Sequence, residues 1–593
     1  MTKAHSFHIP VMGIGFTIDS PIKVSQYGID SVISLVDDIL LEKLRKMYCE
    51  KFELPYIEIS EKMNDFRAKR ITSYLNLIQD LAQKKFEEFK NFTVESIVEV
   101  KKYFSMLPES SLLNKEFKHL TKDNFSLEDL KIWIKDNLHM GSIDVNIMTK
   151  VDKDNYIKKE KLPPEFNDAH AALRGYANSN LSSSLILSAG MNPRLYSYLE
   201  HFKDFYPDEN GIIKKKIILK VSDYRSALIQ GKFLAKKGIW VSEYRIESGL
   251  NCGGHAFATD GYLMGPILEQ FKAEKENLRA SVFEILITAL SSKNKIVPKS
   301  ILPLKLSAQG GVGTSDEQKF LLDYYKIDSV GWGTPFLLVP EATTVDATTI
   351  EKLVAAKEED LYLSTISPLG IPFHSLRGNT KDIEKEKRIA KGNPGSSCPK
   401  KFVALNKDFL ETGMCTASRQ YQYLKIKELD SKKLNTIEYA YQLNKITEKS
   451  CTCVGLGTSA LLAYNLDTKT EGKGVSICPG PNMAYFNKTL LLAEMVDHIY
   501  GRTNMITRTD RPHMFIKELY IYIAYLKDLM LENETTTNEK QHKYLLAFAA
   551  NLKDGIIYYQ DLFYNEHAIL NALKDARNTL NELVLEIDLI EIS

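Results

Sequence analysis

The chain has 593 residues, which at roughly 100 to 200 residues per domain allows about three to five structural units. Lys and Arg total 77 against 76 for Asp and Glu, so the formal net charge of +1 provides no overall field to attract nucleic acid or an anionic membrane. With 44% hydrophobic residues the chain has material for large cores, and its composition excludes an intrinsically disordered protein and a dedicated polyanion binder.

The amino-terminal residues carry no apolar signal core, and no later apolar run approaches the ~20 residues that span a bilayer. Seven cysteines are too sparse for a disulfide scaffold in a chain of this size. We therefore expect a cytoplasmic protein with no membrane segment and no nucleic-acid partner.

Short apolar segments alternate with helical or polar stretches up to about residue 345, which is the pattern of parallel strands joined by crossover helices. Eight such segments predict an α/β fold of the (β/α)₈ type, a TIM barrel. The expected strands cover residues 11–15, 31–35, 142–148, 183–188, 217–221, 239–246, 304–308 and 329–334.

About 100 residues separate the second strand from the third, which is more than a crossover requires. We expect a helical insertion over 38–140, and without it the first 350 residues come close to the ~250 typical of the barrel. The apolar residues that recur inside it at helical spacing are Ile71, Tyr74, Leu75, Ile78, Leu81 and Ala82.

A charged and then Gly-, Pro- and Ser-rich segment at 378–397 predicts a boundary after the barrel. Beyond residue 512, apolar residues at helical spacing over 516–526 and 569–587 flank a polar stretch at 532–541 and predict a mainly helical C-terminal extension. The expected domains are the barrel over 1–37 and 141–380, the insertion over 38–140, a cysteine-containing segment over 381–490 and a helical region over 491–593.

The segment SAQGGVGTSDE contains Gly310, Gly311 and Gly313 just after a predicted strand. Glycines there let backbone amides approach a phosphate, and Thr314 or Ser315 then caps a helix whose positive end faces the same anion. The next strand ends in Gly333 and Thr334, and in barrels a phosphate site recurs after the seventh and eighth strands. The alternative is a turn whose glycines serve only positive φ angles.

The segment NCGGHAF follows the sixth predicted strand and places His255 after Gly253 and Gly254. Barrel active sites lie at the carboxyl ends of the strands, and histidine transfers protons near neutral pH. His255 is therefore the candidate catalytic residue.

NCGGHAF, SAQGGVGTSDE, GWGTPFLLVPEA, SPLGIPFHSLRGN and the opening PVMGIG together resemble nitronate monooxygenases, formerly called 2-nitropropane dioxygenases, and the related flavin-dependent enoyl-acyl carrier protein reductases. The resemblance covers about residues 9–380 without the insertion. It implies a barrel that binds FMN, with His255 as the catalytic base. The positions that it assigns to the cofactor are Met12, Gly13, Asn146, Lys220, Gly253, Gly254, Gly310, Gly311, Gly313, Gly333 and Thr334.

Some of these positions have a second interpretation. Lys220 would stabilise a reduced flavin as a cation, or would form a salt bridge at the barrel mouth. Asn146 would contact the flavin or make a strand-end hydrogen bond. The sequence departs from the family pattern at Cys252, which is either a reactive thiol or a small apolar residue that fills the turn.

Five cysteines fall within the segment that follows the barrel, and soft thiolates gathered from several loops bind zinc or an iron–sulfur cluster. The alternative is a set of unrelated buried thiols, because no Cys-x-x-Cys pair occurs. The residues are Cys398, Cys415, Cys451, Cys453 and Cys478.

The leading functional hypothesis is an FMN-dependent oxidoreductase that oxidises a nitronate, or a similar carbanion, with dioxygen as the second small substrate. The first alternative is an NAD(P)H-dependent enoyl-thioester reductase on the same scaffold. The second is a flavin protein, with or without an iron–sulfur cluster, that passes electrons to a partner. The insertion and the helical tail are candidate surfaces for such a partner or for a homo-oligomer.

Overall fold

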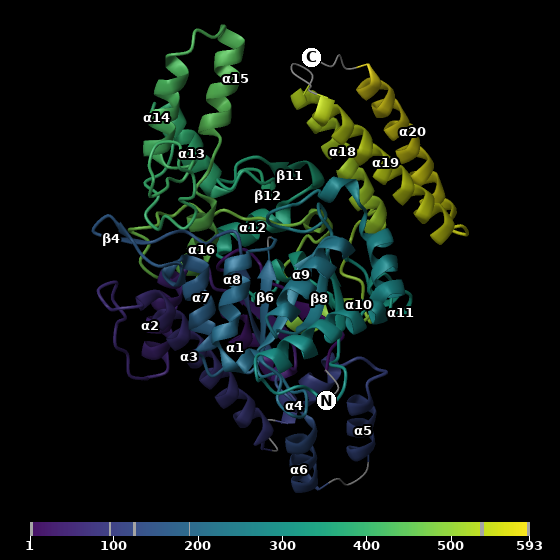
Figure 1. Cartoon of the computed structure of the whole chain (residues 1–593). Helices are drawn as coiled ribbons and strands as arrows, with labels where there is room; N and C mark the ends of the chain where they lie inside the picture. Colours follow the sequence, from purple (N-terminus) through teal and green to yellow (C-terminus); the bar gives the residue numbers. More distant parts are fainter. Residues whose placement is uncertain (1–3, 94–96, 123–125, 189, 534–538, 590–593) are drawn as a thin grey trace.

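The computed structural model describes residues 4–93, 97–122, 126–188, 190–533 and 539–589. Eight parallel strands close into a barrel in the order β1, β2, β3, β6, β7, β8, β9 and β10, which confirms the TIM-barrel prediction (Figure 1). The strands are β1 (Phe7–Ile9), β2 (Asp30–Ser34), β3 (Ile143–Met148), β6 (Ser184–Ser188), β7 (Lys216–Val221), β8 (Val241–Glu247), β9 (Lys305–Gln309) and β10 (Ser329–Gly331).

Seven expected strands overlap the observed ones, but the first was placed wrongly. The observed β1 lies before the expected segment 11–15, and His8 pairs with Asp30 on one side and Gly331 on the other. The expected segment turns instead, because Gly13 has φ +54°, and the amide of Gly15 donates to the carbonyl of Leu456 at 3.1 Å. Residues 11–15 therefore form part of the barrel mouth.

Helices cover the outside of the barrel, and apolar side chains fill its interior. Val32, Ile186 and Ile218 from three strands form a buried cluster, with Val11 packed on it from the mouth. The helices are α1 (Ser20–Val24), α7 (Asp168–Ala177), α8 (Pro193–Tyr198), α9 (Tyr224–Lys236), α10 (Met264–Ser292), α11 (Ser315–Asp323) and α12 (Ala347–Ala355). Two small hairpins are β4 (Tyr156–Ile157) with β5 (Glu160–Lys161), and β11 (Leu361–Ser364) with β12 (Phe373–Leu376).

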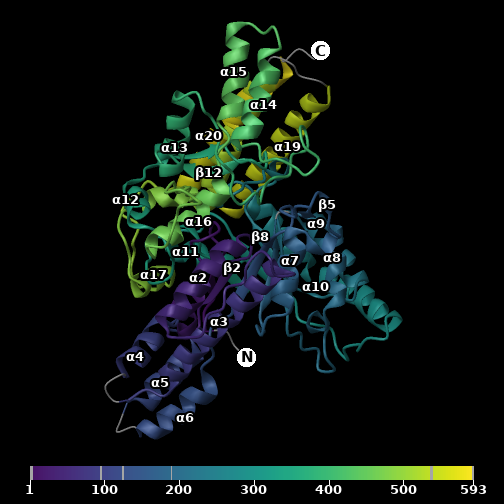
Figure 2. The same ribbon diagram turned by 90° about the vertical axis from the view of Figure 1, so that its left-hand side faces the viewer.

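The described residues within 38–140 are mainly helical, and the apolar residues that the sequence placed on one helical face are all buried in α3. α3 packs on α2 and α7, so it occupies the position of a barrel helix after β2. α4, α5 and α6 extend away from the end of the molecule where the C-terminal helices lie (Figures 1 and 2). The bounds are α2 (Asp38–Lys51), α3 (Phe66–Lys90), α4 (Ile97–Met106), α5 (Leu112–Leu120) and α6 (Leu127–Asn137).

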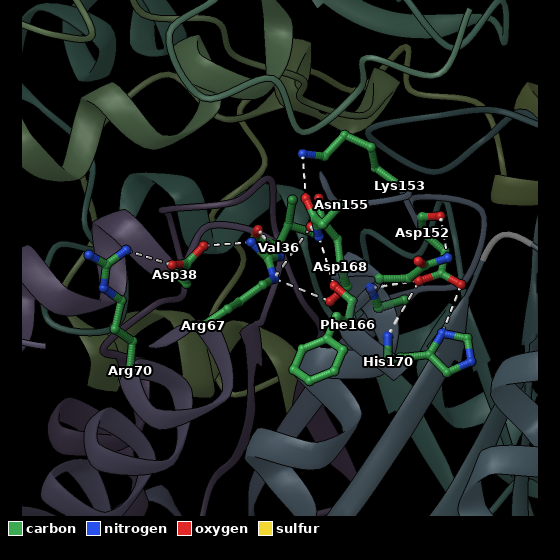
Figure 3. A network of polar contacts seen from close by, with 12 residues as sticks. Val36, Asp38, Arg67, Arg70, Asp152, Lys153, Asn155, Phe166, Asp168 and His170 are labelled. Carbon is green, nitrogen blue, oxygen red and sulfur yellow. Dashed lines mark hydrogen bonds and ion pairs between the residues drawn. The ribbon is translucent and has the colours of Figure 1, made fainter. Parts of the chain in front are cut away.

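A buried polar network fixes α3 against the barrel (Figure 3). The carboxylate of Asp38 bridges Arg67 at 2.5 Å and Arg70 at 2.9 Å. Arg67 also donates to the carbonyls of Val36 and Asp168, which lie after β2 and at the start of α7. Because each buried charge has a partner of opposite sign, the network joins three elements without leaving an uncompensated ion.

The segment after the barrel is also largely helical. The charged stretch that predicted a boundary forms α13, whose first turn is capped by the Asn379 side chain. α14 and α15 form a hairpin that projects beyond the carboxyl ends of the barrel strands (Figure 1). The helices are α13 (Thr380–Ala390), α14 (Arg419–Asp430), α15 (Thr436–Thr447), α16 (Thr452–Ala463) and α17 (Leu492–Ile499).

Beyond residue 512, the described residues form three helices, α18 (Met514–Asn533), α19 (Glu539–Leu562) and α20 (His567–Asp588). The sequence predicted α18 and α20, whereas α19 was missed. Residues 534–538 of the polar stretch lie outside the described residues. Among the described helices, none combines the length and apolar character needed to cross a bilayer.

Glu518 joins α18 to the barrel from a fully buried position. Its carboxylate accepts hydrogen bonds from the hydroxyl of Ser248 at 2.5 Å and the amide of Met264 at 2.9 Å. Burial raises the pKa of Glu518 to about 7. Between the unfolded pKa of about 4.3 and pH 7, the folded state therefore binds the extra proton, and the free energy of unfolding falls as the pH rises.

Glu518→Gln removes this titration, so we expect the variant to gain up to about 3 kcal/mol of stability over the parent at pH 8 and little at pH 4. Denaturant unfolding at both pH values measures the difference. Glu582→Gln, at an exposed position on α20, is the control. An equal effect of Glu518→Gln at both pH values would contradict the raised pKa of Glu518.

Candidate active site

A cavity of about 670 Å³ lies at the carboxyl ends of the barrel strands. Its lining brings together residues that lie far apart in the sequence, from Pro10 to Tyr544. Of the predicted site residues, it contains Met12, Gly13, Asn146, Lys220, Gly253, Gly254, His255, Gly310, Gly311, Gly333 and Thr334.

The glycine turn before His255 is held by two distant segments. The Gly254 amide donates to the carbonyl of Cys478 at 3.2 Å, and its carbonyl accepts from the amide of His374 at 2.9 Å. Gly254 has φ +82°, which favours glycine, and a Cβ on Gly253 would come within 2.5 Å of the Cys478 carbonyl oxygen. Both glycines are therefore required by the path of the chain, whatever the turn binds.

His255 lies in this turn with its Nε2 at 2.7 Å from the hydroxyl oxygen of Ser367. Burial, with a smaller contribution from the cation of Lys220, lowers the pKa of His255 to about 4. The imidazole is thus neutral at physiological pH, with one ring nitrogen able to accept a proton and the other able to donate one.

Lys220 forms an ion pair with Glu247 at 2.8 Å across the mouth of the barrel. Lys220 therefore forms the salt bridge that the sequence offered as one interpretation. Both residues also line the cavity, so Lys220 lies beside the candidate cofactor site as well. Burial, together with the nearby Glu247, raises the pKa of Cys252 well above the usual range. Cys252 is therefore a thiol that fills space at neutral pH, and it is not a ready nucleophile.

The backbone amides at the amino-terminal end of helix α11 are hydrogen-bonded to side chains of the protein itself. Thr314 caps the helix, and the amides of Gly313 and Thr314 both donate to the carboxylate of Glu317. Arg511 pairs with that carboxylate at 2.7 Å. The amides of Gly313 and Thr314 are therefore not available to a ligand. Gly313 also lies outside the cavity lining.

The backbone amides in the loop just before that helix, in contrast, are available as hydrogen-bond donors. Among the described residues, the amides of Gly310, Gly311, Val312 and Gly333 have no hydrogen-bond acceptor, and all four residues line the cavity. A Cβ on Gly333 would meet nothing closer than 3.4 Å, so the space beside this amide is open as well. These amides form a cradle for an oxyanion.

Two side-chain amide oxygens on the cavity wall also have no hydrogen-bond donor among the described residues. The Oδ1 of Asn146 and the Oε1 of Gln309 are buried without a hydrogen-bond donor in the part of the chain that the structure describes. Buried carbonyl oxygens cost free energy when unpaired, so these two atoms are available to accept a hydrogen bond from a bound water or ligand.

One wall of the cavity comes from residues 452–482, which no motif had marked as part of the site. The amide of Gly480 donates to the hydroxyl of Thr334 at 3.0 Å. The Asn482 side chain donates to the carbonyls of Gly311 and Val312 at 2.7 and 2.8 Å. The same segment therefore closes the cavity and fixes the glycine loop beneath it.

No family model matches the sequence, and no curated protein matches it. Among solved structures, FabK from Thermotoga maritima is 14% identical, with 64% of this chain and 82% of that chain covered and a TM-score of 0.30. The enoyl reductase domain of MlnA from the macrolactin biosynthesis cluster of Bacillus amyloliquefaciens is 15% identical, with 74% and 90% covered and a TM-score of 0.32. Likeness at this level does not assign an activity.

Proposed function

We propose that the chain is an FMN-dependent oxidoreductase of the nitronate monooxygenase type, which oxidises a nitronate or a similar stabilised carbanion with dioxygen. The observation that carries the proposal is the cradle of unpaired amides at Gly310, Gly311, Val312 and Gly333, which lies in the same cavity as His255. The motifs that resemble flavin enzymes supply these same residues.

The residues present fit FMN. The amide cradle would hold the phosphate, and the open oxygens of Asn146 and Gln309 would accept from polar N–H groups of the flavin ring. Lys220 would place a positive charge beside a reduced ring. The flavin supplies the electron-accepting chemistry when bound, and the protein supplies position, charge and an enclosed cavity.

His255 would act as the general base for a neutral substrate by accepting the proton next to the activating group. Its hydrogen bond to Ser367 would orient the imidazole, and burial would keep it neutral. A substrate that is already ionised requires no base, so His255 would then only position it.

A second candidate is reduction of an enoyl thioester by NAD(P)H. The observation that favours it is the extent of the cavity, which reaches Tyr525 on α18 and Tyr544 on α19, well beyond the glycine turn. A cavity of this length suits an elongated substrate.

Purified protein should show a flavin absorbance spectrum or bind added FMN. Absence of both overturns the proposal. Under anaerobic conditions a nitronate should bleach the flavin, and NAD(P)H should hardly do so. Rapid bleaching by NAD(P)H alone would instead favour the second candidate.

Gly333→Ala tests the cradle directly. The added methyl group clashes with no protein atom, since its nearest neighbour would be Pro10 at 3.4 Å, but it occupies space beside the open amide. We expect thermal stability without flavin to stay close to the parent and FMN affinity to fall about 10- to 100-fold, because a hydrogen bond to a charged group contributes about 1.5 to 3 kcal/mol. Unchanged affinity would remove Gly333 from the phosphate site.

A further inference from the structure

A second cavity, of about 970 Å³, lies beside α14 and shares no lining residue with the cavity of the candidate active site. It is formed by the loop after β3 with the β4–β5 hairpin, by the segment between α13 and α14, and by one face of α14. Its size is that of a pocket for a small organic ligand.

The lining of the second cavity is rich in cations. It carries five basic side chains and two acidic ones, whereas the first cavity carries two of each. The basic residues are Lys153, Lys159, Lys401, Arg419 and Lys427. In a chain whose formal net charge is only +1, this local excess attracts an anion to one place.

These cations have no carboxylate partner within the described ranges. Of the two acidic lining residues, Asp154 pairs with Lys161 at 2.7 Å and with Lys407 at 3.6 Å, both of which lie outside the lining. Asp430 accepts a hydrogen bond from the hydroxyl of Tyr439 at 2.7 Å. The protein therefore leaves the basic groups of the second cavity available to a ligand.

One face of α14 presents a cation, an aromatic ring and a second cation in succession. Arg419, Tyr423 and Lys427 are four residues apart, so they lie on one side of the helix, about 6 Å apart along its axis. The Lys427 ammonium lies 4.6 Å from the centre of the Tyr423 ring, which is still 54% exposed. The helix thus offers charges for phosphate groups next to a flat surface for an aromatic base.

Another part of the lining is apolar and includes two of the cysteines that the sequence grouped together. Cys398 and Cys415 pack with two alanines in a small buried cluster beside the second cavity. Cys453 and Cys478 line the first cavity, and Cys451 belongs to the main core. In the part of the chain that the structure describes, no group of three or more His, Cys, Asp or Glu side chains is placed to hold a metal ion.

Two of the lysines are held in a backbone conformation that favours glycine. Lys159 has φ +75° and Lys401 has φ +55°. Lysine at such a position costs free energy that glycine would avoid, and residues held in this way are concentrated at ligand sites. The conformation therefore supports a use for the two side chains beyond folding.

We propose that the second cavity binds a nucleoside diphosphate. Its phosphates would pair with Lys401 and Arg419, because lysine and arginine are the side chains that bind phosphate oxygens. Its base would lie against the exposed part of the Tyr423 ring. An inorganic phosphate would leave most of the 970 Å³ unfilled and would not use the aromatic and apolar parts of the lining.

Isothermal titration calorimetry of the purified full-length protein with ADP and with UDP tests the proposal. FMN is kept in excess, so that it competes with the nucleotide for the amide cradle of the first cavity. We expect one nucleotide per chain with a Kd below about 1 mM. Pyrophosphate, which lacks the base, should bind at least about tenfold more weakly.

Lys401→Gly removes one cation and relieves the backbone at the same position. We expect the affinity for ADP to fall at least about tenfold, whereas the melting temperature should stay equal or rise. The matched control is Lys326→Gly, because Lys326 has φ +56°, is exposed and lies outside both cavities. This control should keep the affinity of the parent. Arg419→Gln removes a second cation from an ordinary helical position and should also weaken binding at least about tenfold.

Absence of ADP and UDP binding would overturn the proposal. Binding that neither Lys401→Gly nor Arg419→Gln weakens would also overturn it, because the nucleotide would then lie elsewhere. Equal affinity for pyrophosphate and ADP would show that the base makes no contact and would overturn the assignment to a nucleotide. None of these results depends on whether the first cavity binds flavin.

Discussion

Replacing His255 with alanine is expected to leave FMN bound and to reduce turnover of a neutral substrate by roughly 10² to 10⁴, the usual contribution of a general base. The imidazole is in the cavity, but its position in the turn is set by the backbone of Gly254 and His374, so the cofactor site should survive the change. Stopped-flow measurement of flavin reduction gives the rate, and the absorbance spectrum confirms cofactor retention.

Ser367→Ala is the matched control, because it removes the hydrogen bond to His255 and leaves the imidazole in place. We expect a loss of about fivefold, in keeping with about 1 kcal/mol for one neutral hydrogen bond. If His255 is the base, its pKa of about 4 predicts that the turnover rate of the parent protein does not change through this residue near neutral pH and falls only as the pH drops toward 4. An unchanged rate in His255→Ala would exclude proton transfer by this residue.

Replacing Lys400 with methionine is expected to lower the free energy of unfolding by about 3 to 5 kcal/mol, the range measured when one partner of a buried ion pair is removed. The ammonium group lies 2.6 Å from Asp37 and 3.1 Å from Glu471, and all three side chains are at most 1% exposed. Without the cation the buried Asp37 loses its ion pair, and Glu471 keeps only the partly exposed Lys43. Denaturant unfolding followed by tryptophan fluorescence measures the loss.

Lys43→Met is the appropriate comparison, because Lys43 pairs with the same Glu471 at 2.8 Å but is 28% exposed. A partly solvated pair contributes about 1 kcal/mol or less, so its loss should be clearly smaller. If the two substitutions lowered the free energy of unfolding equally, burial of the ion pairs of Lys400 would add nothing to their contribution to stability.

Strand positions in the barrel could be predicted because each strand is a short apolar run between helical segments, and burial on both faces of a parallel strand produces that pattern. β1 was misplaced because its three residues include His8, whereas the more apolar residues 11–15 turn at Gly13. α19 was missed because its apolar positions begin only after a polar stretch.

The glycine loops could be predicted from the sequence because a tight turn or a close backbone contact after a strand requires glycine, which is visible as a local motif. His255 could be predicted because it directly follows such a glycine pair. The partners across the cavity left no such signal. Asn482 reaches the Gly311 carbonyl from 171 positions away, and Arg511 pairs with Glu317 from 194 positions away. Such pairings depend on the tertiary path of the chain.

The wall formed by residues 452–482 has a consequence for any attempt to shorten the protein. The last barrel strand ends at Gly331, yet Gly480 and Asn482 hold the loop that carries the open amides. A fragment that stops at residue 380 would keep every barrel strand and lose one side of the chamber, so solvent would enter from that side. The shortest fragment that retains the whole cavity therefore extends well past the barrel. Transfer of the barrel alone into a related chain would leave out one wall of the cavity.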